Sequence, residues 1–323
     1  MKTMIKTSYS RISDFDRNGP SALLEREHIS GTGVSFGSLV DDLISGVDVN
    51  DNYIFYDETT PLTDTVRKLA DAVIEIAKEE DVSGIDTDYV LRVRKERNFY
   101  ARLVDMKTII GKFDNPSFWN YVEAHFVANK TDRRILSSEL HSQAILCVDT
   151  LKTHSHTRNV FSGDVHYQEP FEVELEGVLV RGIIDMVSID HETKTIQFRD
   201  LKTGAGTYNE FLYSSFYKYR YFIQSYLYMH AFQQVCEAHC LVGYKLLDFQ
   251  FVYIGRKQNV PVILNISDSF QMKVESGFTS RYNVQYRGVK ELIELIKWHY
   301  KYQEFEYSKA LLDANGLIEI DSI

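Results

Sequence analysis

The spacing of apolar positions divides the chain near residue 165. Before this point helical periodicity dominates, and its clearest example, residues 60–80, includes a candidate N-cap at Thr63. The apolar positions that follow recur at three- and four-residue steps: Val66, Leu69, Ala70, Val73, Ile74 and Ala77. Residues 132–154 show a second amphipathic pattern. Residues 1–165 are therefore predicted to be mainly helical.

After residue 165, short apolar runs bounded by polar turns predict strands. The expected elements are, in order, strands at Phe171–Leu175, Val178–Ile189 and Thr195–Leu201, an aromatic-rich helix at Tyr208–Cys236, strands at Leu247–Tyr253 and Val260–Ile266, and a helix at Val289–Phe305. This β-β-β-α-β-β-α order over 166–323 favours an α/β or α+β fold with a central mixed sheet flanked by helices. The length of 323 residues allows a single domain over 1–323.

Two aspartates interrupt the second and third of these strands. If the polar segment 191–194 is a hairpin turn, paired residues have numbers that sum to about 385, which places Asp185 directly opposite Asp200. Two carboxylates this close repel each other unless a cation lies between them. Hard oxygen ligands at this spacing suit Mg²⁺ or Mn²⁺. The hairpin therefore predicts a divalent metal site.

Lys202 lies two residues beyond Asp200, so on a strand its side chain emerges on the same face. An ammonium group beside a metal-bound water can orient the nucleophile or offset charge that grows on a phosphoryl group. Asp185, Asp200 and Lys202 are together the minimum set for metal-dependent phosphodiester hydrolysis. The alternative is that "DLKTG" is an ordinary strand end followed by a turn, in which Gly204 and Gly206 supply positive φ.

A polar pair, Gln224 and Tyr228, lies four residues apart on one face of the next expected helix. Alone, this pair also fits an amphipathic helix whose tyrosines pack against the core. Together, however, G-x-x-D, D-x-K-T-G and Q-x-x-x-Y resemble the RecB-like branch of the PD-(D/E)XK nuclease superfamily, most closely the phage recombination exonucleases of the exonuclease VIII (RecE) type. This resemblance implies a restriction-endonuclease-like core.

The resemblance also implies roles for individual residues. Asp185 and Asp200 would be metal ligands, with the backbone carbonyl of Leu201 as a further ligand. Lys202 would be the catalytic lysine, and Gln224 and Tyr228 would line the active site and the DNA.

The resemblance extends to the N-terminal region. "SYSRISDF", residues 8–15, is similar to the serine-rich opening of that branch. "FGSLVDDLI", residues 36–44, is similar to its G-x-x-x-H motif, but Asp41 stands where the family usually has a metal-binding histidine. Asp41 is therefore the expected third acidic ligand, with Asp42 and Glu174 as alternatives.

Charge is segregated along the chain, although the net charge of −10 at first argues against nucleic acid as a partner. Residues 88–112 are rich in Lys and Arg, and Arg94 and Arg97 are candidate DNA contacts there. A solvated helix face explains this stretch equally well. Lys218 and Arg220 are further candidates, because they precede Gln224 in the same expected helix.

The activity implied by the resemblance is Mg²⁺-dependent exonucleolytic degradation of linear double-stranded DNA for recombination or end processing. It implies duplex DNA ends as substrate, a single-strand annealing protein as partner, and a ring-shaped homo-oligomer. The N-terminus has no apolar signal core and no apolar run is long enough for a membrane span, so we expect a location in the bacterial or phage-infected cytoplasm.

Several alternatives compete with this interpretation. The chain could be a non-catalytic DNA-binding or assembly protein that keeps the fold, or a structure-specific endonuclease. Nucleotide binding at "LKTGAGTYNE" is disfavoured, because the spacing of a phosphate-binding loop is missing. A zinc site at His154 and His156 lacks further ligands at a suitable spacing, and the three cysteines do not predict an iron–sulfur cluster: Cys147, Cys236 and Cys240.

Overall fold

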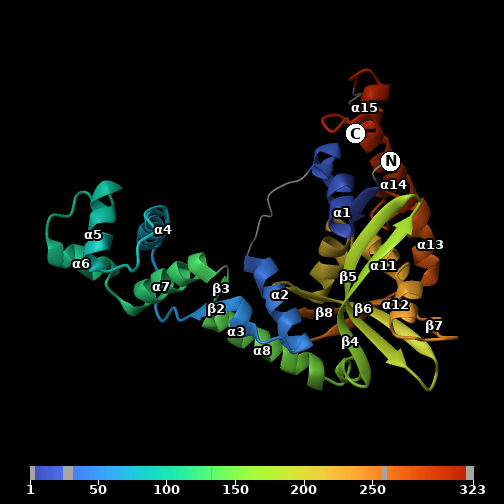
Figure 1. Ribbon diagram of the computed structural model, residues 1–323, viewed down its shortest axis with the longest axis horizontal. Coiled ribbons are helices and arrows are strands. Elements are labelled where there is room, and N and C mark those ends of the chain that lie inside the picture. Colours follow the sequence, from blue (N-terminus) through green and yellow to red (C-terminus); the bar gives the residue numbers. More distant parts are fainter. Residues whose placement is uncertain (1–3, 25–31, 132, 257–259, 318–323) are drawn as a thin grey trace. The chain divides into compact units, whose positions relative to one another are not determined.

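A computed structural model of the chain describes residues 4–24, 32–131, 133–256 and 260–317 (Figure 1). Its contacts divide the chain into two compact units, the first formed by 1–29 together with 149–323 and the second by 30–148. The boundary after residue 148 precedes the change in sequence pattern near 165. The single domain over 1–323 that the sequence suggests stays a prediction.

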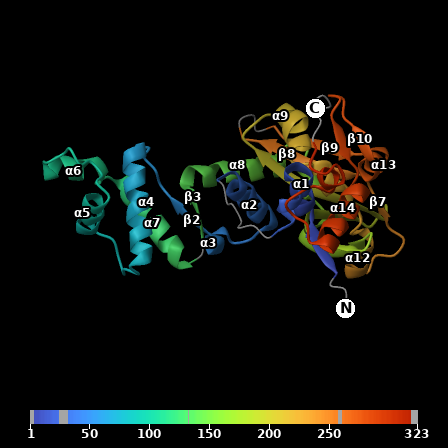
Figure 2. The same cartoon turned by 90° about the horizontal axis from the view of Figure 1, so that it is seen from above.

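The second unit is mainly helical, as its sequence predicts. Its elements are α2 (Thr32–Ser45), α3 (Val49–Asn52), β2 (Tyr53–Tyr56), α4 (Asp64–Glu79), α5 (Thr87–Glu96), α6 (Met106–Phe113), α7 (Pro116–Thr131), β3 (Arg134–Ser137) and the first part of α8 (Ser138–Thr153). The apolar face predicted for 60–80 is buried in α4, which lies against α7 (Figure 2). The helix expected over 132–154 begins only at Ser138, because the preceding residues pair with β2 as the parallel strand β3.

The first unit contains the central sheet. Its strands are β1 (Ile5–Ser8), β4 (Asp164–Leu175), β5 (Val178–Asp190), β6 (Thr195–Gly204), β7 (Lys245–Leu246), β8 (Phe249–Gly255) and β9 (Val262–Ile266). Parallel and antiparallel pairs both occur, and the unit also contains a small hairpin of β10 (Gly277–Thr279) and β11 (Gln285–Arg287). The predicted fold class, a mixed sheet flanked by helices, is confirmed.

Helices pack against this sheet through a shared apolar core (Figure 1). The longer helices of the unit are α1 (Tyr9–Asn18), α11 (Tyr221–Met229), α13 (Asp268–Ser276) and α14 (Val289–Tyr302). Phe15 of α1, Phe222 of α11 and Ile296 of α14 all belong to the core cluster. Periodicity in the sequence does not predict β1, α13 or the β10–β11 hairpin, because each is short or lacks a clear periodic pattern.

The long aromatic helix expected over 208–236 is broken into several pieces. They are α9 (Tyr208–Glu210), the π-helical turn η3 (Phe211–Ser215), α10 (Phe216–Lys218), α11, and α12 (Phe232–Ala238). The break before α11 falls at Arg220, whose φ of 58° is left-handed. The continuous helical periodicity of the sequence therefore predicted one helix, but tertiary contacts impose a turn at Arg220.

The strands β5 and β6 pair over only part of their length. Their antiparallel ladder runs from Asp190 opposite Thr195 to Met186 opposite Arg199. Beyond this point β6 pairs with β8 in parallel, and the first residues of β5 pair with β1. The two strands therefore separate at the next pair of positions, 185 and 200.

Close packing at Gly182 of β5 gives a test of this arrangement. A Cβ atom there would lie 2.7 Å from the Phe171 ring and 3.2 Å from the Tyr228 ring. We expect Gly182→Ala to lower the free energy of unfolding by about 1–2 kcal/mol, because overpacking outweighs the entropy that alanine removes from the unfolded chain. Urea unfolding followed by circular dichroism measures this change. The exposed neighbour provides a control, since Arg181→Ala should stay within about 0.5 kcal/mol.

Candidate active site

The point where β5 and β6 separate carries the two predicted carboxylates. The ladder has the expected sum of 385 from Asp190 opposite Thr195 to Met186 opposite Arg199, and Asp185 and Asp200 are the next residues along the two strands. They lie one step beyond the last paired residues, and the backbone N–H of Leu201 donates to Asp185 Oδ2 at 2.9 Å. A backbone hydrogen bond from β6 thus holds the Asp185 carboxylate where the two strands separate.

Asp200 is the buried centre of the site, with 1% of its surface exposed. Its Oδ2 lies 2.5 Å from Lys202 Nζ, and its Oδ1 accepts a hydrogen bond of 2.5 Å from Gln224 Nε2. The strand thus presents Asp200 and Lys202 on one face, as the period of two predicts. Gln224 reaches them from α11, so residues far apart in the sequence converge on one carboxylate.

Aromatic rings surround the Lys202 ammonium. Nζ lies 4.5 Å from the centre of the Tyr221 ring and 5.9 Å from that of Phe251. Burial, the largest single effect, lowers the pKa of Lys202, but the charges of Asp200, Tyr221 and Asp185 act together and raise this pKa well above its ordinary value. Lys202 is therefore a cation at neutral pH.

Tyr228 lies one helical turn beyond Gln224 and is also buried. Its ring packs edge-on against Phe171, with 5.1 Å between the ring centres. Burial raises the pKa of the Tyr228 hydroxyl, and the nearby charges of Asp200 and Asp185 raise it further. Tyr228 is therefore a neutral phenol near both carboxylates, on the helix face shared with Gln224.

Buried oxygen atoms make this site suitable for a hard cation. Asp200 Oδ2 forms an ion pair with Lys202 Nζ, and Gln224 Oε1 is buried and accepts no hydrogen bond. Buried acceptors usually have hydrogen-bond partners. Two carboxylates beside such oxygens form the donor set that Mg²⁺ or Mn²⁺ prefers. The residues present therefore fit a divalent metal ion.

The structure corrects one alternative ligand. Glu174 is exposed on β4 and lies opposite Leu179 of β5, six residues before Asp185. At about 3.3 Å per residue this separation is roughly 20 Å along the strand, which is too far to share a cation with Asp185. The prediction of Glu174 as the third ligand was therefore wrong. It arose because the extent of β4 was not known from the sequence.

The other ligand candidates stay predictions. Asp41 and Asp42 lie in α2 of the second unit, where Asp42 Oδ2 accepts a 2.9 Å hydrogen bond from the Tyr53 hydroxyl. Ser45 donates to the backbone carbonyl of Asp41 at 2.8 Å. Leu201 follows Asp200 on β6, and its carbonyl as a metal ligand also stays a prediction.

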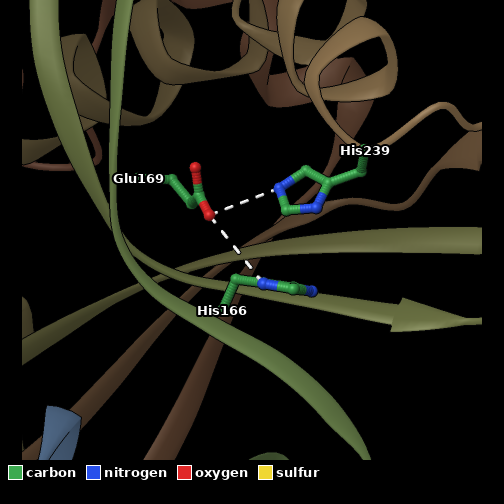
Figure 3. A group of neighbouring side chains, drawn as sticks. All are labelled: His166, Glu169 and His239. Carbon is green, nitrogen blue, oxygen red and sulfur yellow. Dashed lines mark ion pairs between the residues drawn. The ribbon is translucent and has the colours of Figure 1, made fainter.

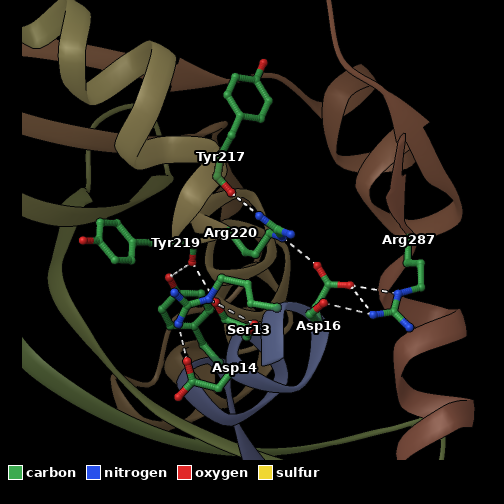
Figure 4. Close-up of polar contacts among 9 residues, drawn as sticks. Ser13, Asp14, Asp16, Tyr217, Tyr219, Arg220 and Arg287 are labelled. Atoms are coloured by element: carbon green, nitrogen blue, oxygen red, sulfur yellow. Dashed lines mark hydrogen bonds and ion pairs between the residues drawn. The ribbon is translucent and has the colours of Figure 1, made fainter. Parts of the chain in front are cut away.

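A buried ion-pair cluster fixes the turn that precedes α11 (Figure 4). Asp16 of α1, whose side chain is 6% exposed, accepts from Arg220 Nε at 2.6 Å and from Arg287 Nε at 2.9 Å. Arg220 also donates to the Tyr217 carbonyl at 2.6 Å. The guanidinium group predicted to contact DNA is thus used to hold a left-handed turn. Its role as a DNA contact stays a prediction without support from this geometry.

The remaining basic candidates differ in their surroundings. Lys218 is exposed, with Nζ 5.3 Å from the centre of the Tyr219 ring. In the second unit, Arg94 donates to the carbonyls of Tyr100 and Leu103. Arg97 forms a 3.6 Å ion pair with Glu75. Lys218 is therefore the candidate most available to a ligand.

Tyr9 is a site residue that the sequence analysis missed. Its hydroxyl donates to the Tyr219 carbonyl at 2.5 Å. Burial raises the pKa of this hydroxyl, while the charge of nearby Lys202 opposes the shift. The signal was present in "SYSRISDF", but the pairing of β1 with β5 is needed to bring Tyr9 to the site.

Comparisons with known proteins agree with this geometry at the level of the superfamily. Residues 114–258, less than half of the chain, match the family model of the PD-(D/E)XK nuclease superfamily. This segment includes Asp185, Asp200 and Lys202, so the motif residues lie within the part of the chain that is similar to that nuclease superfamily. No curated protein matches the chain.

Among solved structures, the chain is similar to a crystal structure described as a "Putative exonuclease" from Eubacterium rectale. The identity is 13%, the TM-score is 0.41, and the match covers 96% of this chain and 82% of the other. Within the described ranges, no helix combines the length and apolar character needed to cross a bilayer.

The Asp16 cluster can be tested by neutralising its carboxylate. Asp16→Asn should lower the free energy of unfolding by about 3 kcal/mol, because it leaves two guanidinium groups without their buried partner. It should also speed proteolytic cleavage near residues 216–220. The matched control is Asp14→Asn, since Asp14 forms a more exposed i,i+3 pair with Arg17 and should contribute less than about 1 kcal/mol. Equal effects of the two substitutions would contradict this interpretation.

Proposed function

We propose that this protein is a metal-dependent deoxyribonuclease that hydrolyses phosphodiester bonds from the ends of linear double-stranded DNA. The observation that carries the proposal is the convergence of Asp185, Asp200 and Lys202 where β5 and β6 separate. The match of residues 114–258 to a nuclease superfamily supports the hydrolytic part. The exonuclease activity, the duplex substrate and the role in phage-type recombination rest on the motif resemblance.

Asp185 and Asp200 would hold Mg²⁺ or Mn²⁺ through their carboxylates. When bound, such a cation lowers the pKa of an attacking water and offsets charge on the phosphate. Gln224 donates to one oxygen of Asp200, which fixes the rotation of that carboxylate and keeps its other oxygen directed toward Lys202. The chain thus orients the donor set before substrate binds.

Lys202 would stabilise negative charge that develops on the phosphoryl oxygens. Its ammonium is already charged, because Asp200 raises its pKa. It is also held in place by the surrounding rings of Tyr221 and Phe251. A cation fixed in this way needs little reorganisation as the transition state forms.

The proposed substrate and partners follow the same resemblance. They are duplex DNA ends, a single-strand annealing protein, and further copies of this chain in a ring. Light scattering of the protein in solution would give the number of copies, and a monomeric mass with and without linear DNA would contradict the ring.

The activity can be tested with linear duplex DNA labelled at either the 5′ or the 3′ end, in Mg²⁺ or EDTA. Lys202→Met and Asp200→Asn should each reduce the rate by at least about 10²–10³-fold, because the first removes a positive charge beside the reacting phosphate and the second removes a proposed metal ligand. Lys273→Ala is the matched control, because Lys273 is an exposed lysine on α13 and should leave the rate unchanged. The label released first gives the polarity.

A closed circular duplex distinguishes the alternatives. Cleavage of the circle would indicate an endonuclease. DNA binding without metal-dependent cleavage of either substrate would indicate a binding or assembly protein that keeps the fold. Full activity of the Lys202→Met protein would contradict the proposed site itself.

Lys218 gives a separate prediction about DNA affinity. If its exposed ammonium contacts a phosphate, Lys218→Ala should weaken binding to all sequences and reduce the slope of log K against log salt by about 1. Fluorescence anisotropy at several salt concentrations measures this slope in a Ca²⁺ buffer with the Asp200→Asn background. An unchanged slope, equal to that of Lys273→Ala, would show that Lys218 does not contact the DNA backbone.

A further inference from the structure

A second group of metal-ligating side chains lies in the first unit, apart from the two catalytic carboxylates. His166 and Glu169 come from β4, and His239 follows the last residue of α12 (Figure 3). One potential ligand atom from each residue lies within 4.8 Å of the other two. Figure 3 shows the carboxylate of Glu169 directed toward both imidazole rings.

The backbone of β4 brings two of these side chains together. Residues three apart on a regular strand point to opposite faces. Between His166 and Glu169, however, Gln168 has a φ of 57°. Left-handed backbone at a residue other than glycine is uncommon and costs about 1 kcal/mol or more. This kink interrupts the alternation, and both side chains turn toward His239.

The distances suit a compact metal site. Glu169 Oε1 lies 3.3 Å from His239 Nε2 and 3.9 Å from His166 Nδ1. Ligand atoms at about 2.1 Å from a tetrahedral metal ion are separated by about 3.4 Å. One of the two distances already has this value, and the other requires a shift of about half an ångström. The ligand atoms of the two histidines lie within 4.8 Å of each other.

A carboxylate supports His166 from its other side. His166 Nε2 lies 3.0 Å from Asp164 Oδ1, which leaves Nδ1 to face Glu169. Asp164 Oδ2 also lies 2.9 Å from His191 Nε2, and His191 Nδ1 lies 2.6 Å from the Tyr244 hydroxyl. A metal-binding histidine commonly donates its second N–H to a carboxylate, which fixes the ring and its tautomer. The extended network thus resembles the outer shell of a metal site.

A second, independent feature of this cluster is a buried nitrogen of His239. Its Nε2 is buried and has no hydrogen-bond partner, although Glu169 Oε1 lies nearby at 3.3 Å. The two rings of His166 and His239 also lie only 4.2 Å apart, centre to centre. A shared cation would satisfy the buried nitrogen.

We propose that His166, Glu169 and His239 bind a divalent transition-metal ion of the Zn²⁺ class. Two imidazole nitrogens and one carboxylate oxygen favour such an ion over Mg²⁺, which prefers oxygen ligands. The ion would link β4 to the end of α12 and so stabilise the kinked strand beside β5. This inference does not depend on nuclease activity, because none of the three ligands belongs to the catalytic set.

Titration of the full chain with Co²⁺ tests the site, because visible absorption reports the ligand geometry of this ion. The experiment uses an Asp185→Asn, Asp200→Asn background, so that the catalytic carboxylates contribute no binding. One equivalent of Co²⁺ should give visible bands, and Zn²⁺ should displace it. His239→Gln and Glu169→Gln should each weaken binding at least about tenfold. The control is His156→Gln, which removes an exposed histidine outside the cluster.

Thermal unfolding provides a second measurement. Zn²⁺ should raise the Tm of the background protein and of the His156→Gln control, but not that of His239→Gln. Circular dichroism without metal checks that each variant folds. Equal Co²⁺ affinity in all variants, or no binding by the background protein, would overturn the proposal. In that case the cluster is only a set of polar contacts between the histidines and Glu169.

Discussion

The buried Asp200 carboxylate is the constraint on which the rest of the site depends. A charge with 1% of its surface exposed is costly unless other groups compensate for lost water. Here Lys202 supplies an opposite charge and Gln224 supplies a hydrogen bond. Lys202 lies on the same strand as Asp200, and Gln224 lies on α11. The stabilisation of the buried Asp200 carboxylate therefore depends on the position of that helix.

The position of α11 depends in turn on contacts remote in the sequence. Asp16 of α1 binds Arg220 at the left-handed turn, and Arg287 of β11 closes the same cluster. Tyr9 and Ser13 of α1 add hydrogen bonds to the Tyr219 carbonyl. The N-terminal helix α1 therefore stabilises the turn that positions Gln224. These contacts give "SYSRISDF" a structural role.

The two proposed cation sites differ in donor chemistry, and this difference would keep their ions separate. The catalytic set is built from oxygen atoms at the point where β5 and β6 part. The set formed by His166, Glu169 and His239 offers two nitrogens and one oxygen. Hard ions such as Mg²⁺ favour the former and borderline ions such as Zn²⁺ the latter. The strand β5 lies between the two proposed cation sites, since it pairs with both β4 and β6.

The sequence by itself determined the β5–β6 hairpin, its register and the shared face of Asp200 and Lys202, because these follow from local periodicity and a short turn. It also gave the helix that carries Gln224 and Tyr228. Only the tertiary structure decided the break at Arg220, the exclusion of Glu174 and the approach of Tyr9, since each depends on partners distant along the chain. His239 likewise meets β4 only after α12 packs, so no spacing in the sequence could reveal that cluster.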